Sequence, residues 1–141
     1  IAELFESVAT LARAEAPDLH FELLTDVEPR GLDVFADRDL LEPVLLNIVR
    51  NARQATEGQA DATSRLRARL NRRGNTVIEV ADNGPGVPRD MAQKIFVPFF
   101  TTKASGSGVG LALARQVMTA HGGFIRLADT DAAGATFTLT F

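Results

Sequence analysis

The sequence predicts an α+β domain: a two-layer α/β sandwich in which a mixed sheet of about five strands packs against three helices. Three segments repeat apolar residues at helical spacing, and shorter segments between them alternate apolar and polar residues. No internal repeat and no domain boundary divides the 141 residues, a length that suits one domain with one sizeable core. We therefore expect residues 1–141 to form a single domain.

The first half of the chain is expected to supply two of the helices. Apolar residues recur at helical spacing over residues 1–12, and short strands are expected over residues 20–25 and 33–36. A long helix is expected over residues 39–57, where Pro43 falls within the first turns and is tolerated. The order so far is helix, two strands, helix.

The second half is expected to supply two hairpins separated by a helix. Residues 65–70 alternate arginine with apolar residues and face a second strand over residues 76–81. A helix over residues 109–121 ends at two glycines, and strands over residues 124–128 and 135–141 form the second hairpin. The sheet is therefore expected to be mixed or largely antiparallel.

Composition excludes several classes of function. The formal net charge is −3, so no global positive field favours nucleic acid or an anionic membrane. The absence of cysteine excludes disulfides, zinc–thiolate sites and a cysteine nucleophile. No apolar run approaches the length of about 18 residues that suggests a membrane span. We expect a cytoplasmic domain, whose full-length protein can be membrane-anchored, and in which phosphate binding depends on a few placed donors.

Two asparagines mark one face of the long helix. Asn47 and Asn51 are four residues apart, so their amides stack at the border of the apolar stripe. They fit ordinary surface amides, and they also fit a site where an amide oxygen meets a hard cation such as Mg²⁺.

The stretch Asp82-Asn83-Gly84-Pro85-Gly86 directly follows an apolar strand. A carboxylate at the end of that strand can accept a hydrogen bond from an exocyclic amine, and Gly84 and Gly86 allow backbone to approach a ligand. A plain turn is the alternative, but no strand follows promptly, as a hairpin would require. The irregular segment over residues 82–108 is long enough to be functional rather than a simple connection.

Glycines lead into the last helix at Gly106-Ser107-Gly108-Val109-Gly110-Leu111. Backbone N–H groups at a helix N-terminus favour an anion. A flexible linker with an N-cap serine is the alternative. The stretch is neither a Walker P-loop nor a dinucleotide-binding fingerprint, because Gly-Lys-Ser/Thr is absent and position 111 is Leu.

A phenylalanine-rich segment precedes these glycines. Phe96, Phe99 and Phe100 suggest a hinge that anchors a flap, with Lys103 delivered by the flap to a phosphate; a small satellite core with one solvated lysine is the alternative. His20 and His121 are expected to be structural, because neither has the neighbours expected of a phosphoacceptor histidine.

The order and spacing of these motifs resemble the nucleotide-binding domain of sensor histidine kinases, in the superfamily shared with gyrase B, the large ATP-dependent heat-shock chaperones and MutL. The matching stretches are an N box, a first glycine box, an F box, a second glycine box and a reduced third glycine box, at residues 47–52, 82–86, 96–100, 106–111 and 134–136. The stretch over residues 98–103 is similar to the nitrogen-regulation type. The resemblance implies a Bergerat-type ATP-binding fold.

The resemblance also implies a ligand set for ATP and Mg²⁺. Asp82 would read the adenine amino group, Asn51 would hold Mg²⁺ with a catalytic role shared by Lys103, and Asn47 would lie near the phosphates. Residues 88–107 would form an ATP lid. The remaining nucleotide-binding residues would be Gly84, Gly86, Gly106, Gly108, Val109, Gly110, Leu111 and Thr136, with Thr136 at the back of the pocket.

Two departures from the family pattern concern affinity. Ala135 stands where a second glycine is more usual, and Pro43 stands where a polar residue is common. Neither removes an expected ligand.

The phosphoacceptor histidine, which in the family lies on a dimeric helical hairpin upstream, is absent from this chain. We therefore expect an isolated monomeric domain that binds ATP with little kinase activity alone, and a homodimeric full-length protein that phosphorylates its own hairpin and then a response regulator. A gyrase-like ATPase is one alternative, but it would need a glutamate where Asn47 stands. A non-catalytic nucleotide sensor or scaffold is the other.

Overall fold

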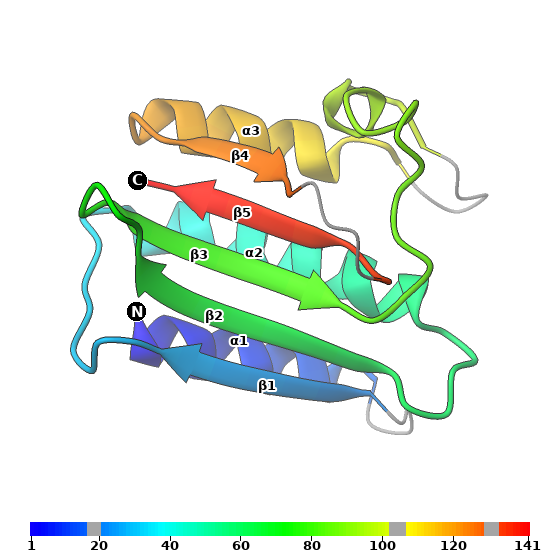
Figure 1. Cartoon of the computed structure of the whole chain (residues 1–141), viewed down its shortest axis with the longest axis horizontal. Coiled ribbons are helices and arrows are strands. Elements are labelled where there is room, and N and C mark those ends of the chain that lie inside the picture. Colours follow the sequence, from blue (N-terminus) through cyan, green and yellow to red (C-terminus); the bar gives the residue numbers. More distant parts are fainter. Residues whose placement is uncertain (17–20, 102–106, 129–132) are drawn as a thin grey trace.

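The computed structural model describes residues 1–16, 21–101, 107–128 and 133–141, which form one sheet with three α-helices layered on it (Figure 1). The helices and strands are, in chain order, α1 (Ala2–Ala14), β1 (Glu22–Val27), α2 (Arg38–Ala55), β2 (Thr63–Leu70), β3 (Thr76–Asp82), the short 3₁₀ helix η1 (Lys94–Phe96), α3 (Gly110–Ala120), β4 (Phe124–Leu127) and β5 (Thr136–Thr140). The α+β two-layer sandwich predicted from the sequence is confirmed.

The sheet is mixed, with strand order β1-β2-β3-β5-β4. β1 runs parallel to β2, and the other three neighbouring pairs are antiparallel. Both predicted hairpins are present, β2 with β3 and β4 with β5. Because β5 inserts between β3 and β4, the end of β3 lies beside the beginning of β5, where Ala81 pairs with Thr136.

The core lies between the sheet and the helices. Apolar residues at helical spacing face it from each helix, and alternate residues face it from the central strands. Its most deeply buried large side chains are Phe5, Val8, Leu41, Leu45, Ile48, Val49, Leu66, Ile78, Val80, Met118 and Leu139. None of the helices in the described residues combines the length and apolar composition that crossing a bilayer requires.

The strand predicted over residues 33–36 is wrong. Leu32 is buried, Val34 and Ala36 pack against the core, and Phe35 is fully exposed, so burial alternates along this segment as it would in a strand. However, the segment is irregular and is not part of the sheet; the Asp33 carbonyl accepts a side-chain bond from Thr76 Oγ1 at 3.4 Å. A segment forms a strand only where it can pair with the free edge of a sheet. Residues 33–36 cannot pair with β2 or β3, because each of these strands already has a neighbouring strand on both sides.

The start of α2 is fixed by Asp37 and His121. Asp37 Oδ1 accepts from the backbone N–H groups of Asp39 (2.9 Å) and Leu40 (3.4 Å), as an N-cap does. The Asp37 N–H donates to His121 Nε2 at 2.9 Å, and His121 Nδ1 lies 2.7 Å from the Val117 carbonyl oxygen. These contacts confirm the structural role predicted for His121, while His20 lies outside the described residues.

We expect Asp37→Ala to lower the free energy of unfolding by about 1 kcal/mol, because two N–H groups of the first turn of α2 lose their acceptor. Asp37→Ser keeps a capping oxygen and should retain most of the stability. Urea unfolding followed by circular dichroism measures both values. Equal losses for the alanine and serine variants would contradict the capping role.

Candidate functional site

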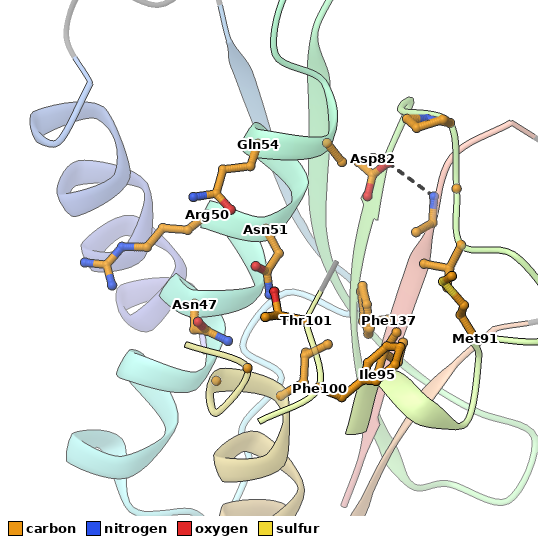
Figure 2. Close-up of a pocket in the computed structure, with 18 of the residues that line it drawn as sticks. Asn47, Arg50, Asn51, Gln54, Asp82, Met91, Ile95, Phe100, Thr101 and Phe137 are labelled. Carbon is orange, nitrogen blue, oxygen red and sulfur yellow. Dashed lines mark hydrogen bonds between the residues drawn. The ribbon is translucent and has the colours of Figure 1, made fainter. Parts of the chain in front are cut away.

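A cavity of about 430 Å³ opens at the end of the sheet where β3 gives way to the loop that follows it (Figure 2). α2 supplies one wall, the loop after β3 the opposite wall, and the beginning of α3 closes a third side. The lining is polar along α2 and mostly apolar along the loop. The described residues that line it are Asn47, Arg50, Asn51, Gln54, Ala55, Asp82, Pro85, Gly86, Val87, Pro88, Met91, Ile95, Phe100, Thr101, Ser107, Gly108, Gly110, Leu111, Ala135 and Phe137.

Asp82 is the carboxylate of the apolar end, and its orientation is fixed from two directions. Oδ1 accepts from the Gly84 N–H at 2.9 Å and from the Ala135 N–H at 3.2 Å. The backbone also holds it, because the Asp82 N–H donates to the Ala135 carbonyl at 2.9 Å. Among the described residues these side-chain bonds engage Oδ1, which leaves Oδ2 to accept from a ligand.

Of the other residues in the stretch after β3, Asn83 and Gly84 support the turn, and Pro85 and Gly86 line the cavity. The Asn83 amide accepts from the Thr63 N–H at 2.9 Å and donates to the Asp61 carbonyl at 2.8 Å, so it ties this turn to the start of β2. Gly84 does not line the cavity, and its N–H orients Asp82. Pro85 and Gly86 do line it. The structure thus brings Asp82 and Gly86 to the site and places Gly84 behind them.

The polar wall is one face of α2. Asn47, Arg50, Asn51 and Gln54 stand at positions i, i+3, i+4 and i+7, so all four side chains leave the same side of the helix. Both asparagines were predicted from the sequence, whereas Arg50 and Gln54 were not, although the same helical spacing would have identified them.

Asn47 has an unmet hydrogen-bonding capacity. Its Nδ2 is buried and has no partner among the described residues, an arrangement that costs free energy unless a ligand completes it. Figure 2 shows this nitrogen on the cavity side of α2. An acceptor-rich group, such as a phosphate, matches the donor.

The beginning of α3 lies against Asn47. Ser107, Gly108, Gly110 and Leu111 line the cavity, whereas Val109 does not and is partly exposed. A Cβ on Gly110 would lie 2.4 Å from Asn47 Oδ1, closer than atoms can approach. The glycine therefore permits the first turn of α3, whose first N–H groups have no acceptor within the helix, to approach the amides of α2.

We expect Gly110→Ala to weaken binding of the ATP that the family resemblance implies by about tenfold, because the new methyl group displaces the Asn47 amide from the cavity wall. The substitution should not lower stability much, since alanine is the better helix former by about 1 kcal/mol. Calorimetric titration with ATP and a thermal melt measure the two effects. Unchanged affinity would show that Asn47 does not contribute to binding.

The apolar end is formed by the loop and the sheet together. Met91, Ile95 and Phe100 face Phe137 of β5 across the cavity (Figure 2). Phe96 is buried and packs edge-on against Phe137, with ring centroids 6.3 Å apart and an interplanar angle of 81°. Phe96 thus anchors this segment to the core, and Phe100 lines the site.

Five of the predicted site residues do not lie in the described lining: Gly84 and Val109, as described above, together with Thr136, Lys103 and Gly106. Ala135 and Phe137 line the cavity, and Thr136, predicted at the back of the pocket, does not. Side chains alternate along a strand, and Phe137 faces the core, so Thr136 points to the other side. Lys103 and Gly106 lie outside the described residues. Within the described ranges no group of three or more His, Cys, Asp or Glu residues could hold a metal ion, so a cation here would depend on amide and ligand oxygens.

Comparison with known proteins agrees with this geometry. Residues 36–141 match the family described as histidine kinase-, DNA gyrase B-, and HSP90-like ATPase. The chain is 38% identical to the signal transduction histidine-protein kinase AtoS of Escherichia coli over 96% of its own length and 22% of AtoS. It is 33% identical to the nitrogen regulation protein NtrY of Azorhizobium caulinodans over 99% of its length and 18% of NtrY. The chain therefore spans about a fifth of the curated relatives it matches.

Solved structures of the same fold are catalytic domains of histidine kinases. The nucleotide-free catalytic domain of ThkA superposes with a TM-score of 0.86 at 28% identity, covering 100% of this chain and 91% of that one. ThkA in complex with the response regulator TrrA gives 0.82 at 26% identity, covering 100% and 40%. Full-length ShkA in complex with AMPPNP gives 0.83 at 30% identity, covering 98% and 29%. The chain belongs to the family of histidine kinase-, DNA gyrase B- and HSP90-like ATPases, and within it to the catalytic domains of sensor histidine kinases.

Proposed function

We propose that this chain binds Mg-ATP in the cavity beside α2 and supplies the γ-phosphate to a histidine on a separate helical hairpin. The observation that carries the proposal is the polarity of the cavity: a fixed carboxylate, Asp82, stands at its apolar end, and the amides of Asn47 and Asn51 stand at its polar end. A nucleotide has the same polarity, with an apolar base that carries an amine at one end and phosphates at the other.

At the base end, Asp82 Oδ2 accepts from the adenine amino group, while Met91, Ile95 and Phe137 enclose the ring. At the phosphate end, the first N–H groups of α3 near Gly108 and Gly110 face the phosphates, and Asn47 Nδ2 donates to a phosphate oxygen. The buried, unpartnered state of that nitrogen supports its assignment. Lys103 and the rest of residues 88–107 are proposed to cover the nucleotide as a lid.

The residues at the polar end suit a magnesium ion. Asn51 offers an amide oxygen, which is a hard ligand, and Mg²⁺ usually takes one or two protein oxygens together with phosphate oxygens and waters. When bound, the ion would neutralise charge that develops on the transferring phosphoryl group. The chain's own residues position the nucleotide and exclude water, which is most of what phosphoryl transfer requires from a protein.

The relatives support the partners that we propose. ThkA has been solved with a response regulator, and this chain spans only part of the kinases it resembles. We propose that the full-length protein is a homodimer in the cytoplasmic phosphorelay, with the phosphoacceptor hairpin supplied by its own sequence and a response regulator downstream. The 141-residue chain alone is proposed to be a monomer.

Titration of the chain with ATP, with and without Mg²⁺, tests the binding proposal. We expect binding that Mg²⁺ strengthens and that Asn51→Ala renders independent of Mg²⁺. We also expect no label on the chain after incubation with γ-labelled ATP, because the acceptor histidine is missing. Absence of ATP binding would refute the nucleotide site, and rapid labelling of the 141-residue chain would refute the division of labour between domains.

A further inference from the structure

Arg50 is the one cation among the described residues that line the cavity, where Asp82 is the only other charged residue. It stands on α2 between Asn47 and Asn51. A nucleotide with several phosphates would bring strong negative charge to this wall. The sequence motifs assign no function to Arg50.

The guanidinium of Arg50 is turned away from the cavity. Figure 2 shows the side chain extending toward α1, on the far side from the Asn47 and Asn51 amides. There Arg50 Nε donates to Glu15 Oε2 at 2.7 Å, and Arg50 Nη2 donates to Glu15 Oε1. These two parallel bonds lower the pKa of the Glu15 carboxyl below its ordinary value, with a smaller opposing effect of burial. Glu15 thus stays ionised and remains paired with Arg50.

This ion pair is easily exchanged. The side chains of Arg50 and Glu15 are 45% and 30% exposed, so water screens the pair, and such pairs contribute only about 0.2–1 kcal/mol. The planar fork of a guanidinium binds a phosphate with the same two-pronged geometry as a carboxylate. A bound polyphosphate carries more charge than Glu15 and would therefore compete for the same N–H groups.

The pair is not needed to attach α1. The apolar side chains of Phe5, Val8 and Ala12 are buried in the common core. Arg53, one turn further along α2, also donates to the Ala12 carbonyl at 3.4 Å. The contact between Arg50 and Glu15 thus adds a charge that can be released without undocking the helix.

We propose that Arg50 is a phosphate-binding residue. Without nucleotide its guanidinium is paired with the Glu15 carboxylate, and when a nucleotide binds, the guanidinium leaves Glu15 and binds the terminal phosphates. Glu15 is then a positioning residue: it holds the guanidinium on the α1 side of α2 and so lowers the apparent affinity for polyphosphates. This inference rests on the proposed function, because it concerns the phosphate end of the same ATP site.

The test compares ATP with AMP, which shares the adenosine but lacks the terminal phosphates. Calorimetric titrations would be run with the parent chain, Glu15→Gln, Arg50→Gln and the double variant. We expect Glu15→Gln to tighten ATP binding by about two- to fivefold and to leave AMP binding unchanged. We expect Arg50→Gln to weaken ATP binding by about tenfold, again without effect on AMP. In the double variant the gain from Glu15→Gln should disappear.

Glu6→Gln is the matched control, since it makes the same change of charge at an exposed position of α1. It should leave ATP binding unchanged. An ATP-to-AMP affinity ratio that Arg50→Gln does not alter would overturn the inference, as would a gain from Glu15→Gln that persists without Arg50. Failure of the parent to bind ATP would refute the proposed function itself, and the two failures are therefore distinguishable. A thermal melt of each variant confirms that the measured chains are folded.

Discussion

Asp82→Asn should reduce ATP affinity by about tenfold to a hundredfold, the loss of about 1.5–3 kcal/mol expected when a hydrogen bond to a charged acceptor is removed from a desolvated site. The isosteric amide can still accept at Oδ1 from the Gly84 and Ala135 N–H groups, so the local turn is retained. The other arm becomes an NH₂ donor that faces the adenine amine, which is also a donor. The substitution thus replaces a hydrogen bond with a repulsive contact between two donors.

Asp61→Asn is the matched control for Asp82→Asn. Asp61 is exposed in the adjacent loop, and its carbonyl, which accepts from Asn83, is unchanged by the substitution. Calorimetric titration of both variants with ATP, together with inosine triphosphate on the parent, measures the effect. The parent should discriminate against inosine, whose 6-oxo group is an acceptor. Equal affinity of Asp82→Asn and the parent would show that the carboxylate does not read the base.

Gly134→Ala should be the most destabilising of the substitutions considered, at about 2–4 kcal/mol. Gly134 has φ +101°, and a Cβ there would lie 1.9 Å from the Asp82 carbonyl oxygen. Both the strain and the collision involve backbone, which cannot rotate away as a side chain can. Relief would require the start of β5 to move from the end of β3, and that movement would also break the bond from the Ala135 N–H to Asp82. Stability and ATP affinity should therefore fall together.

Gly74→Ala separates the two causes of that loss. Gly74 has φ +81° but nothing within 4 Å of the position where its Cβ would lie. It should cost only the strain of a left-handed residue, about 1–2 kcal/mol, and leave ATP affinity intact. Urea unfolding with ATP titration on each variant tests both expectations. If the free energy of unfolding falls equally in the two alanine variants, the close approach of Gly134 to Asp82 does not contribute to the loss of stability.

Local periodicity was enough to predict much of the fold and the site. The helical spacing of Asn47 and Asn51, and the position of Asp82 just after a strand, depend on neighbours within one element. These residues meet in the cavity as expected. The order of the glycine-rich stretches then indicated which elements meet there.

Features that depend on distant neighbours were not predicted. A strand was expected over residues 33–36, and burial alternates there as it would in a strand, but no free sheet edge receives that segment. The resemblance implied Thr136 at the back of the pocket, although the core positions Phe137 and Leu139 fix the phase of β5 and direct Ala135 to the cavity. The pairing of Arg50 with Glu15 joins residues 35 apart, and no short-range pattern indicates such a contact.

The bond from the Ala135 N–H to Asp82 joins residues 53 apart in the sequence. This separation has a consequence for the order of folding, since contacts between distant segments form late and at an entropic cost. During synthesis, α2 and the β2–β3 hairpin can assemble while residues 134–140 are still to be translated, but the Asp82 carboxylate then lacks half of its support. Because β5 gives that support from the middle of the sheet, the carboxylate is fully oriented for a nucleotide only in molecules whose β5 is already paired with β3.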